Sequence, residues 1–173
     1  MKNDNQININ YHTKQYQKTY ETTKQIIKFL NRKFPLKNKS ILDFGCGAGS
    51  NLYFLKRYKI LESSGVDNDA RLVKIAKQEM KKRGIKDIKF YLSDIEKIKK
   101  IKKIINHQID VVTILQVLSV MDGYKKTINS AVFFKPKFIA VCSLFWDGYL
   151  DIKVKVNFLK KNKEGLKKTT SYN

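Results

Sequence analysis

The chain has 173 residues and a formal charge of +21, from 36 Lys and Arg against 15 Asp and Glu. This length predicts one domain, and the polar, Asn-rich start and the lack of about 18 consecutive apolar residues argue against a signal peptide and a membrane span. Two cysteines without a Cys-x-x-Cys pair argue against a disulfide framework and a metal site. We therefore expect a cytoplasmic protein without a zinc centre.

The positive charge would ordinarily indicate a polyanionic partner. Only four of the 36 basic residues are arginine, the residue best suited to bidentate phosphate contacts. The scarcity of arginine therefore weakens the case for a nucleic-acid partner without removing it.

The first half of the chain alternates between helical and extended patterns. Apolar residues at three- and four-residue steps predict a helix from Gln15 to Lys33, which Pro35 ends. An apolar strand, Ile41 to Phe44, then breaks into three alternating glycines, and a helical pattern resumes at Ser50. A second strand ends at Asp67, and the next helix is capped by Asn68 or Asp69 and closed at Gly84.

The second half continues this alternation up to Leu144. The expected elements are a strand over 88–92, a helical face over 95–105, a strand over 109–115, a helix over 123–134 and a strand over 138–144. Strict alternation from Leu150 to Phe158, a turn at 161–165 and a return over 167–172 predict an antiparallel hairpin.

Together these elements predict an α/β, Rossmann-like, doubly wound parallel sheet with helices on both faces and a C-terminal antiparallel hairpin. We expect one domain with three parts, namely an N-terminal helix or lid (1–36), a core (37–145) and the hairpin (146–173).

The glycines after the first strand mark a ligand-binding turn. Glycine is needed where φ is positive or where a ligand lies against the backbone. Gly45, Gly47 and Gly49 give the spacing G-x-G-x-G. A dinucleotide pyrophosphate site requires G-x-G-x-x-G, so the pattern disfavours NAD.

With Asp43 and the three glycines, the strand and turn read Asp-x-Gly-x-Gly-x-Gly. This resembles the first motif of the class I S-adenosylmethionine (SAM)-dependent methyltransferases, and the resemblance covers about Tyr11 to Leu144. It implies that SAM is the cofactor, that the turn around Cys46 cradles its methionine part and that Asp43 helps to organise the turn.

Further site residues are expected where the other strands end, because ligands of open α/β sheets bind across the carboxyl ends of the strands. Asp67, 18 residues after Gly49, can accept the ribose hydroxyls, with Asn68 beside it. The resemblance places Asp94 and Ile95 at the adenine and Gln116 after the fourth strand. The histidine that many relatives carry after that strand is absent. The alternative role of these acids is to cap loops and helices.

No catalytic triad is present, and an activated methyl donor needs none. A general base is required only for a poorly acidic hydroxyl acceptor. His12 is the candidate base, whereas His107 precedes the fourth strand and is expected at the surface of the opposite edge. Trp146 and Asp147, after the fifth strand, are the candidate contacts to the acceptor.

The leading hypothesis is a SAM-dependent methyltransferase that acts on a small-molecule or carbohydrate-type acceptor by in-line methyl transfer. An RNA methyltransferase is the second hypothesis, although the Asn-Pro-Pro-Tyr-type motif for base amines is missing. The third is a cofactor-binding but catalytically incomplete, truncated member of the family. Truncation would leave a sheet edge exposed and favour a homodimer, so monomer and homodimer both stay open.

Overall fold

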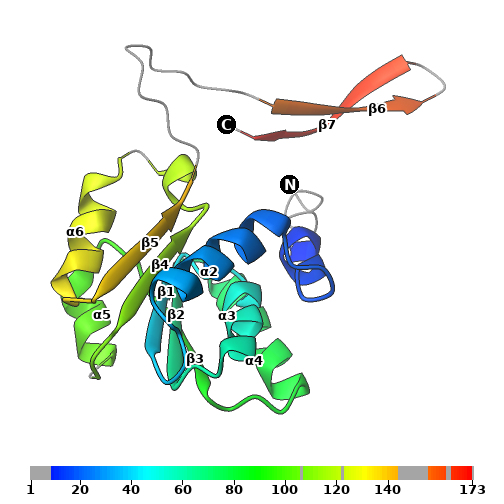
Figure 1. Cartoon of the computed structure of the whole chain (residues 1–173). Coiled ribbons are helices and arrows are strands. Elements are labelled where there is room, and N and C mark those ends of the chain that lie inside the picture. Colours follow the sequence, from blue (N-terminus) through cyan, green and yellow to red (C-terminus); the bar gives the residue numbers. More distant parts are fainter. Residues whose placement is uncertain (1–8, 106, 122, 144–155, 163–164, 173) are drawn as a thin grey trace.

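A five-stranded parallel sheet forms the centre of the protein in the computed structural model, which describes residues 9–105, 107–121, 123–143, 156–162 and 165–172. The strand order is β3-β2-β1-β4-β5 (Figure 1). The strands are β1 (Ser40–Phe44), β2 (Glu62–Asp67), β3 (Ile88–Leu92), β4 (Val111–Leu115) and β5 (Phe138–Cys142). The predicted Rossmann-like sheet is confirmed, and the order reverses between β1 and β4, where such sheets bind their ligands.

Helices cover both faces of the sheet (Figure 1). Helices α2 (Glu21–Lys33), α3 (Ser50–Leu55) and α4 (Ala70–Lys82) pack on one face, and α5 (Ile98–Ile104) and α6 (Lys125–Phe133) on the other. Successive residues of β1 point to opposite faces. Ile41 joins the core under α2, α3 and α4, whereas Leu42 and Phe44 join the core under α5 and α6. Burial on both faces explains the nearly continuous apolar strands.

The predicted start of the first helix at Gln15 was wrong. Residues 9–14 are helical, 15–18 form a turn, and α2 begins only at Glu21. Tyr20 has an extended backbone (φ −58°, ψ 144°) that interrupts the helix. The three- and four-residue spacing of apolar side chains continues through the turn because Tyr16 packs against residues elsewhere in the fold and not against a neighbour in the same helix.

The predicted boundaries of α4 are confirmed in detail. The Asp69 carboxylate accepts a hydrogen bond from the Arg71 amide at 2.8 Å, as an N-cap should. Gly84 follows the helix with φ +68°. Two single-turn 3₁₀ helices complete the connections, η1 (Lys56–Tyr58) after α3 and η2 (Leu118–Val120) after β4.

At the C-terminal end, β6 (Val156–Asn162) and β7 (Gly165–Tyr172) pair antiparallel with each other. Val156 is opposite Tyr172 and Asn162 is opposite Gly165. The hairpin prediction began at Leu150 and placed a turn at 161–165; residues 144–155 and 163–164 lie outside the described residues.

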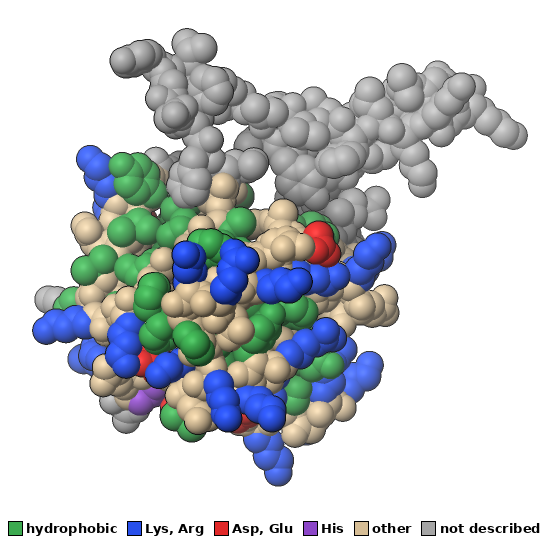
Figure 2. Space-filling model, in the orientation of Figure 1, with side chains coloured by type: hydrophobic (Ala, Val, Ile, Leu, Met, Phe, Trp, Pro, Cys, Tyr) green, Lys and Arg blue, Asp and Glu red, His purple; other side chains and the backbone are tan. Residues whose placement is uncertain are grey.

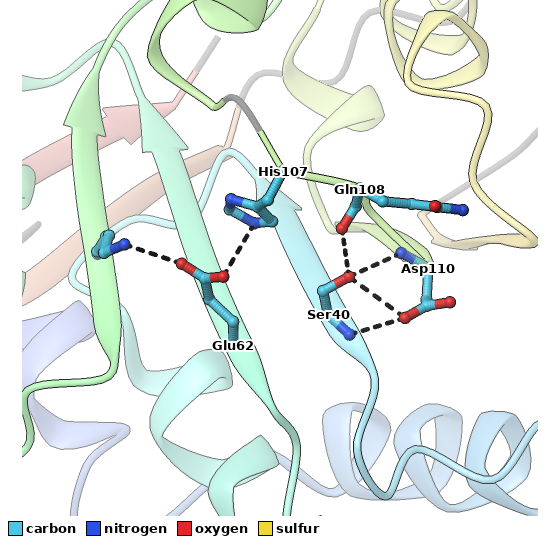
Figure 3. Close-up of polar contacts among 6 residues, drawn as sticks. Ser40, Glu62, His107, Gln108 and Asp110 are labelled. Atoms are coloured by element: carbon cyan, nitrogen blue, oxygen red, sulfur yellow. Dashed lines mark hydrogen bonds and ion pairs between the residues drawn. The ribbon is translucent and has the colours of Figure 1, made fainter.

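A polar cluster ties together the amino ends of the strands (Figure 3). The Ser40 amide donates to Asp110 Oδ2 at 3.0 Å, and Ser40 Oγ donates to the Gln108 carbonyl at 2.6 Å. His107 Nε2 lies 3.7 Å from Glu62 Oε2. This histidine is half-buried, whereas the sequence predicted it at the surface. This edge therefore carries structural contacts, whereas ligands of such sheets bind at the carboxyl ends of the strands.

Candidate functional site

The glycine turn connects β1 to α3 with three left-handed residues. Gly45, Gly47 and Gly49 have φ of +66°, +53° and +88°. A Cβ at Gly47 would lie 2.7 Å from His12 Nδ1, and one at Gly49 would lie 2.6 Å from the Phe90 ring. Backbone conformation and close packing therefore both require glycine here.

Asp67 holds this turn in place from the end of β2. Its Oδ2 accepts a hydrogen bond from the Gly47 amide, and its Oδ1 accepts one from the Asp69 amide, both at 2.8 Å. Each carboxylate oxygen has two lone pairs, so one on each remains after these bonds. The carboxylate can therefore accept two further donors from a ligand.

Next to the turn lies a cavity of about 520 Å³, of a size usual for small-molecule sites. Three carboxylates, those of Asp67, Asp69 and Asp94, line it together with the imidazole of His12. No lysine or arginine is among its described lining residues, although the whole chain carries 36 of them. The cavity is therefore an acidic site within a strongly basic protein.

The N-terminal segment forms one wall of the cavity. Tyr11, His12, Gln15 and Tyr20 all line it, and the Tyr11 and Tyr20 rings lie 5.6 Å apart between centroids. Burial lowers the pKa of His12, although the nearby Asp67 and Asp69 act to raise it. His12 is therefore held in its neutral form at pH 7.

The carboxyl ends of β3 and β4 supply the opposite wall. Asp94 accepts a hydrogen bond from the Glu96 amide at 2.9 Å and remains 39% exposed, and Ile95 lines the cavity beside it. Gln116 has φ +60°, and its Nε2 donates to Thr22 Oγ1 at 3.3 Å. This contact joins the end of β4 to α2.

Asp43 lies beneath the turn and does not line the cavity. Its Oδ1 accepts a hydrogen bond from Thr113 Oγ1 at 2.6 Å, while its buried Oδ2 has no partner. Burial raises the pKa of Asp43 to about 7, with a further contribution from Asp67. Burial likewise raises the pKa of the Cys46 thiol, so this cysteine is a protonated packing residue of the turn.

The structure brings most of the predicted site residues together around the cavity: His12, Gly45, Cys46, Gly47, Asp67, Asn68, Asp94, Ile95 and Gln116. Asp43 and Gly49 support the turn from behind, and Trp146 and Asp147 lie outside the described residues. The other lining residues, which were not predicted as site residues, include Gln15, Thr23, Ser50, Asn51, Asp69, Leu72, Leu115, Val117, Val120 and Met121. Most of these follow directly from a turn or a strand end, so the rule that gave Asp67 could have found them.

A family model described as a methyltransferase domain matches residues 35–169. The chain belongs to the class I SAM-dependent methyltransferases. The matched region of this methyltransferase domain includes the glycine turn and all five strands of the sheet. The chain has no significant match among curated proteins.

Solved structures share the fold of this methyltransferase domain. Magnesium protoporphyrin IX methyltransferase from Synechocystis PCC 6803, solved with bound SAM, is 19% identical over 66% of this chain and 53% of its own length, with a TM-score of 0.55. A SAM-dependent methyltransferase from Aquifex aeolicus is 20% identical over 61% of this chain and 55% of its own (TM-score 0.50). The YcgJ protein from Bacillus subtilis is 17% identical over 61% and 44% (TM-score 0.51). The chain thus spans about half the length of these proteins.

The residues of the cavity fit SAM, the cofactor of the family. The main chain of the turn from Gly45 to Gly47 lines the cavity and can receive the methionine part. Acidic side chains suit a ligand that carries a sulfonium and an ammonium group, and the free lone pairs of Asp67 suit its ribose. Among the described residues, no helix is long and apolar enough to cross a membrane, and no group of three metal-ligating side chains occurs.

Proposed function

We propose that this protein transfers a methyl group from SAM to a small, uncharged acceptor. The observation that carries the proposal is the meeting, in one cavity, of the glycine turn, the Asp67 carboxylate and an uncharged, partly aromatic mouth. Asp67 binds the ribose hydroxyls, Asp94 and Ile95 contact the adenine, and the turn from Gly45 to Gly47 receives the methionine part.

The acceptor binds at the mouth of the cavity. Tyr11 is 44% exposed, Val120 is 83% exposed, and both line the cavity together with Tyr20, Val117 and Met121. Tyrosine rings and apolar side chains suit the flat face of an aromatic or carbohydrate group. The described lining offers no cation to a phosphate or carboxylate, which favours an acceptor without an anionic group.

Trp146 and Asp147, which follow β5, are proposed as further contacts to this acceptor. Their position directly after a strand supports this assignment, because the same position brings Asp67 and Asp94 to the cavity.

The chemistry that remains for the protein is modest. SAM, when bound, supplies a methyl group on a positively charged sulfur. The cavity walls hold the acceptor nucleophile in line with that methyl group and exclude water, and such positioning contributes roughly 7–11 kcal/mol. His12 lines the cavity and is neutral at pH 7, so its imidazole can accept the proton that a hydroxyl acceptor loses.

An RNA acceptor is the second candidate, and the net charge of +21 is the observation that favours it. On the face shown in Figure 2, however, Lys and Arg side chains are spread among hydrophobic and uncharged ones from one end of the described region to the other. A dispersed charge suits long-range attraction but gives no defined track for a phosphate backbone.

Calorimetry with SAM and with its product S-adenosylhomocysteine (SAH) tests the cofactor half of the proposal. Transfer of a radiolabelled methyl group to small phenols and sugars, compared with charged sugar nucleotides and bulk tRNA, tests the acceptor half. Labelling of an uncharged small compound supports the proposal. Labelling of tRNA alone supports the RNA alternative, and tight SAM binding without transfer to any of these compounds supports a catalytically incomplete domain.

The role of His12 has a matched control in the second histidine. With a hydroxyl acceptor, His12→Gln should lower kcat by about 10²-fold or more and remove the acidic limb of the pH profile. His107→Gln, at the amino ends of the strands, should change neither. An unchanged pH profile in His12→Gln would exclude this histidine as the base.

A further inference from the structure

The N-terminal segment touches the glycine turn at three points. The His12 ring lies against Gly47, so close that a Cβ there would be 2.7 Å from its Nδ1. Ser50 Oγ donates a hydrogen bond to Gln15 Oε1 at 3.0 Å, and the pair is buried. Tyr16 Oη donates a hydrogen bond to the Ala48 carbonyl. The segment and the turn are therefore joined along their length.

The Tyr16 ring is in turn held by the far end of α4. The Arg83 guanidinium lies 4.5 Å from the centroid of the Tyr16 ring and 5.2 Å from that of Tyr53 in α3. The two rings are 5.5 Å apart. Arg83 also forms an ion pair with Glu79 and donates to the Glu79 carbonyl at 3.2 Å. Three separate pieces of the chain thus meet at Arg83.

The charges at this junction keep it intact over the physiological pH range. Burial raises the pKa of Tyr16, and the nearby Glu79 raises it further, so the phenol keeps the proton that it donates to Ala48. Burial acts to lower the pKa of Arg83, but the bonds to Glu79 outweigh it and the net shift is upward. A permanent cation therefore faces the two tyrosine rings, an arrangement that stabilises them by cation-π attraction.

We propose that Tyr16, held by Arg83, is a positioning residue that sets the shape of the glycine turn for the cofactor. This inference rests on the proposed SAM-binding function. The hydrogen bond to the Ala48 carbonyl fixes the orientation of the peptide unit between Ala48 and Gly49, and Gly49 is the N-cap of α3 with φ +88°. When only a fraction of the molecules has the turn in its binding shape, the apparent Kd rises by the inverse of that fraction.

The substitution Tyr16→Phe tests this, because it removes the hydroxyl and leaves the ring against Arg83. One neutral hydrogen bond corresponds to about a fivefold change in an equilibrium constant, so the Kd for SAM and for SAH should rise by about that factor. Arg83→Lys keeps the charge but loses the planar group and should act in the same direction. If the two residues work through one contact, the double variant should lose less than the product of the two single losses.

Two controls separate positioning from general destabilisation. Tyr58→Phe removes a hydroxyl from a half-buried tyrosine of η1, away from the turn. Ile109→Val trims a fully buried side chain at the amino ends of the strands and should lower the thermal midpoint. Neither should change the Kd for SAH. The inference is overturned if Tyr16→Phe binds SAH as the unmodified protein does, or if Ile109→Val weakens binding equally.

Hydrogen exchange in the protein without cofactor provides a readout that does not depend on the proposed function. The Gly49 amide donates to the Cys46 carbonyl at 2.9 Å within the turn. It should exchange faster in Tyr16→Phe and at the original rate in Tyr58→Phe. Failure of the unmodified protein to bind SAM or SAH would refute the proposed function, whereas unchanged exchange in Tyr16→Phe would refute the positioning role alone.

Discussion

Replacing Asp67 by alanine removes the one carboxylate that both braces the glycine turn and offers free lone pairs to the cavity. Its two oxygens accept the amides of Gly47 and Asp69, each at 2.8 Å, and the side chain is 9% exposed at the cavity wall. We expect Asp67→Ala to weaken SAM and SAH binding strongly, because two ribose hydroxyls lose a charged acceptor.

The magnitude follows from the geometry. A hydrogen bond to a charged group is worth about 1.5–3 kcal/mol, and two bonds that share one carboxylate are not additive. A loss of roughly 3 kcal/mol corresponds to about a hundredfold increase in Kd. Asp69→Ala removes a second acid from the same cavity, but this carboxylate is already paired with Arg71 at 2.6 Å. Loss of this half-buried but already paired charge should change Kd by less than about fivefold.

Calorimetry with SAH and its 2′-deoxy analogue isolates the ribose contact from damage to the turn. The unmodified protein should bind the deoxy analogue roughly tenfold more weakly than SAH, as expected for one lost hydrogen bond to a charged group. Asp67→Ala should bind the two ligands equally. If the variant still discriminates between them by the original factor, Asp67 does not contact the ribose and the assignment of the site is wrong.

Three further predictions concern the turn and the two ends of the sheet. Gly47→Ala should abolish SAM binding. Gly84 has a similar positive φ, but a Cβ there would have nothing within 4 Å, so Gly84→Ala should cost only about 1–2 kcal/mol of folding stability and leave the Kd for SAM unchanged. Burial raises the pKa of Asp43 from 3.8 to about 7, so the native state binds one more proton than the unfolded state between these pH values, and the free energy of unfolding should fall as pH rises from about 4 to 7. In Asp43→Asn this fall in the free energy of unfolding, measured by denaturation at pH 5 and pH 8, should be smaller. Burial acts to raise the pKa of Asp110, but hydrogen bonds and the charge from Ser40 and Lys137 outweigh it and hold this pKa below the usual range. Asp110→Ala should therefore lower the free energy of unfolding by about 1–3 kcal/mol at pH 7 and by less at pH 3, and it should not weaken SAH binding.

The sheet and the strand-end acids could be predicted because their causes are local. Apolar runs bounded by glycines and charged residues mark buried strands, and parallel strands necessarily present their carboxyl ends on one edge. The position of Asp67 at the cavity could therefore be predicted from spacing, and that of Asp94 from its strand end together with the family resemblance. The cap at Asp69 and the end of α4 at Gly84 are equally local features.

The course of the backbone in the N-terminal wall could not be predicted, because tertiary contacts decide it. Apolar spacing continued the first helix through Tyr16, but the packing of that ring depends on Arg83, 67 positions away in the chain. A motif also does not tell which of its members face the ligand. Asp43 and Gly49 match the family pattern as well as Gly47 does, yet both lie outside the cavity lining.

The acidic lining has a kinetic consequence, because it is enclosed by a molecule of net charge +21. SAM bears one net positive charge, whereas SAH bears none. At low ionic strength the long-range field of the protein repels SAM, and the three aspartates attract it only over the last few ångströms. Salt screens the repulsion beyond a Debye length of about 8 Å at physiological strength. Cofactor capture should therefore speed up as salt is added, the reverse of ordinary electrostatic steering, while departure of the neutral product stays almost insensitive to it.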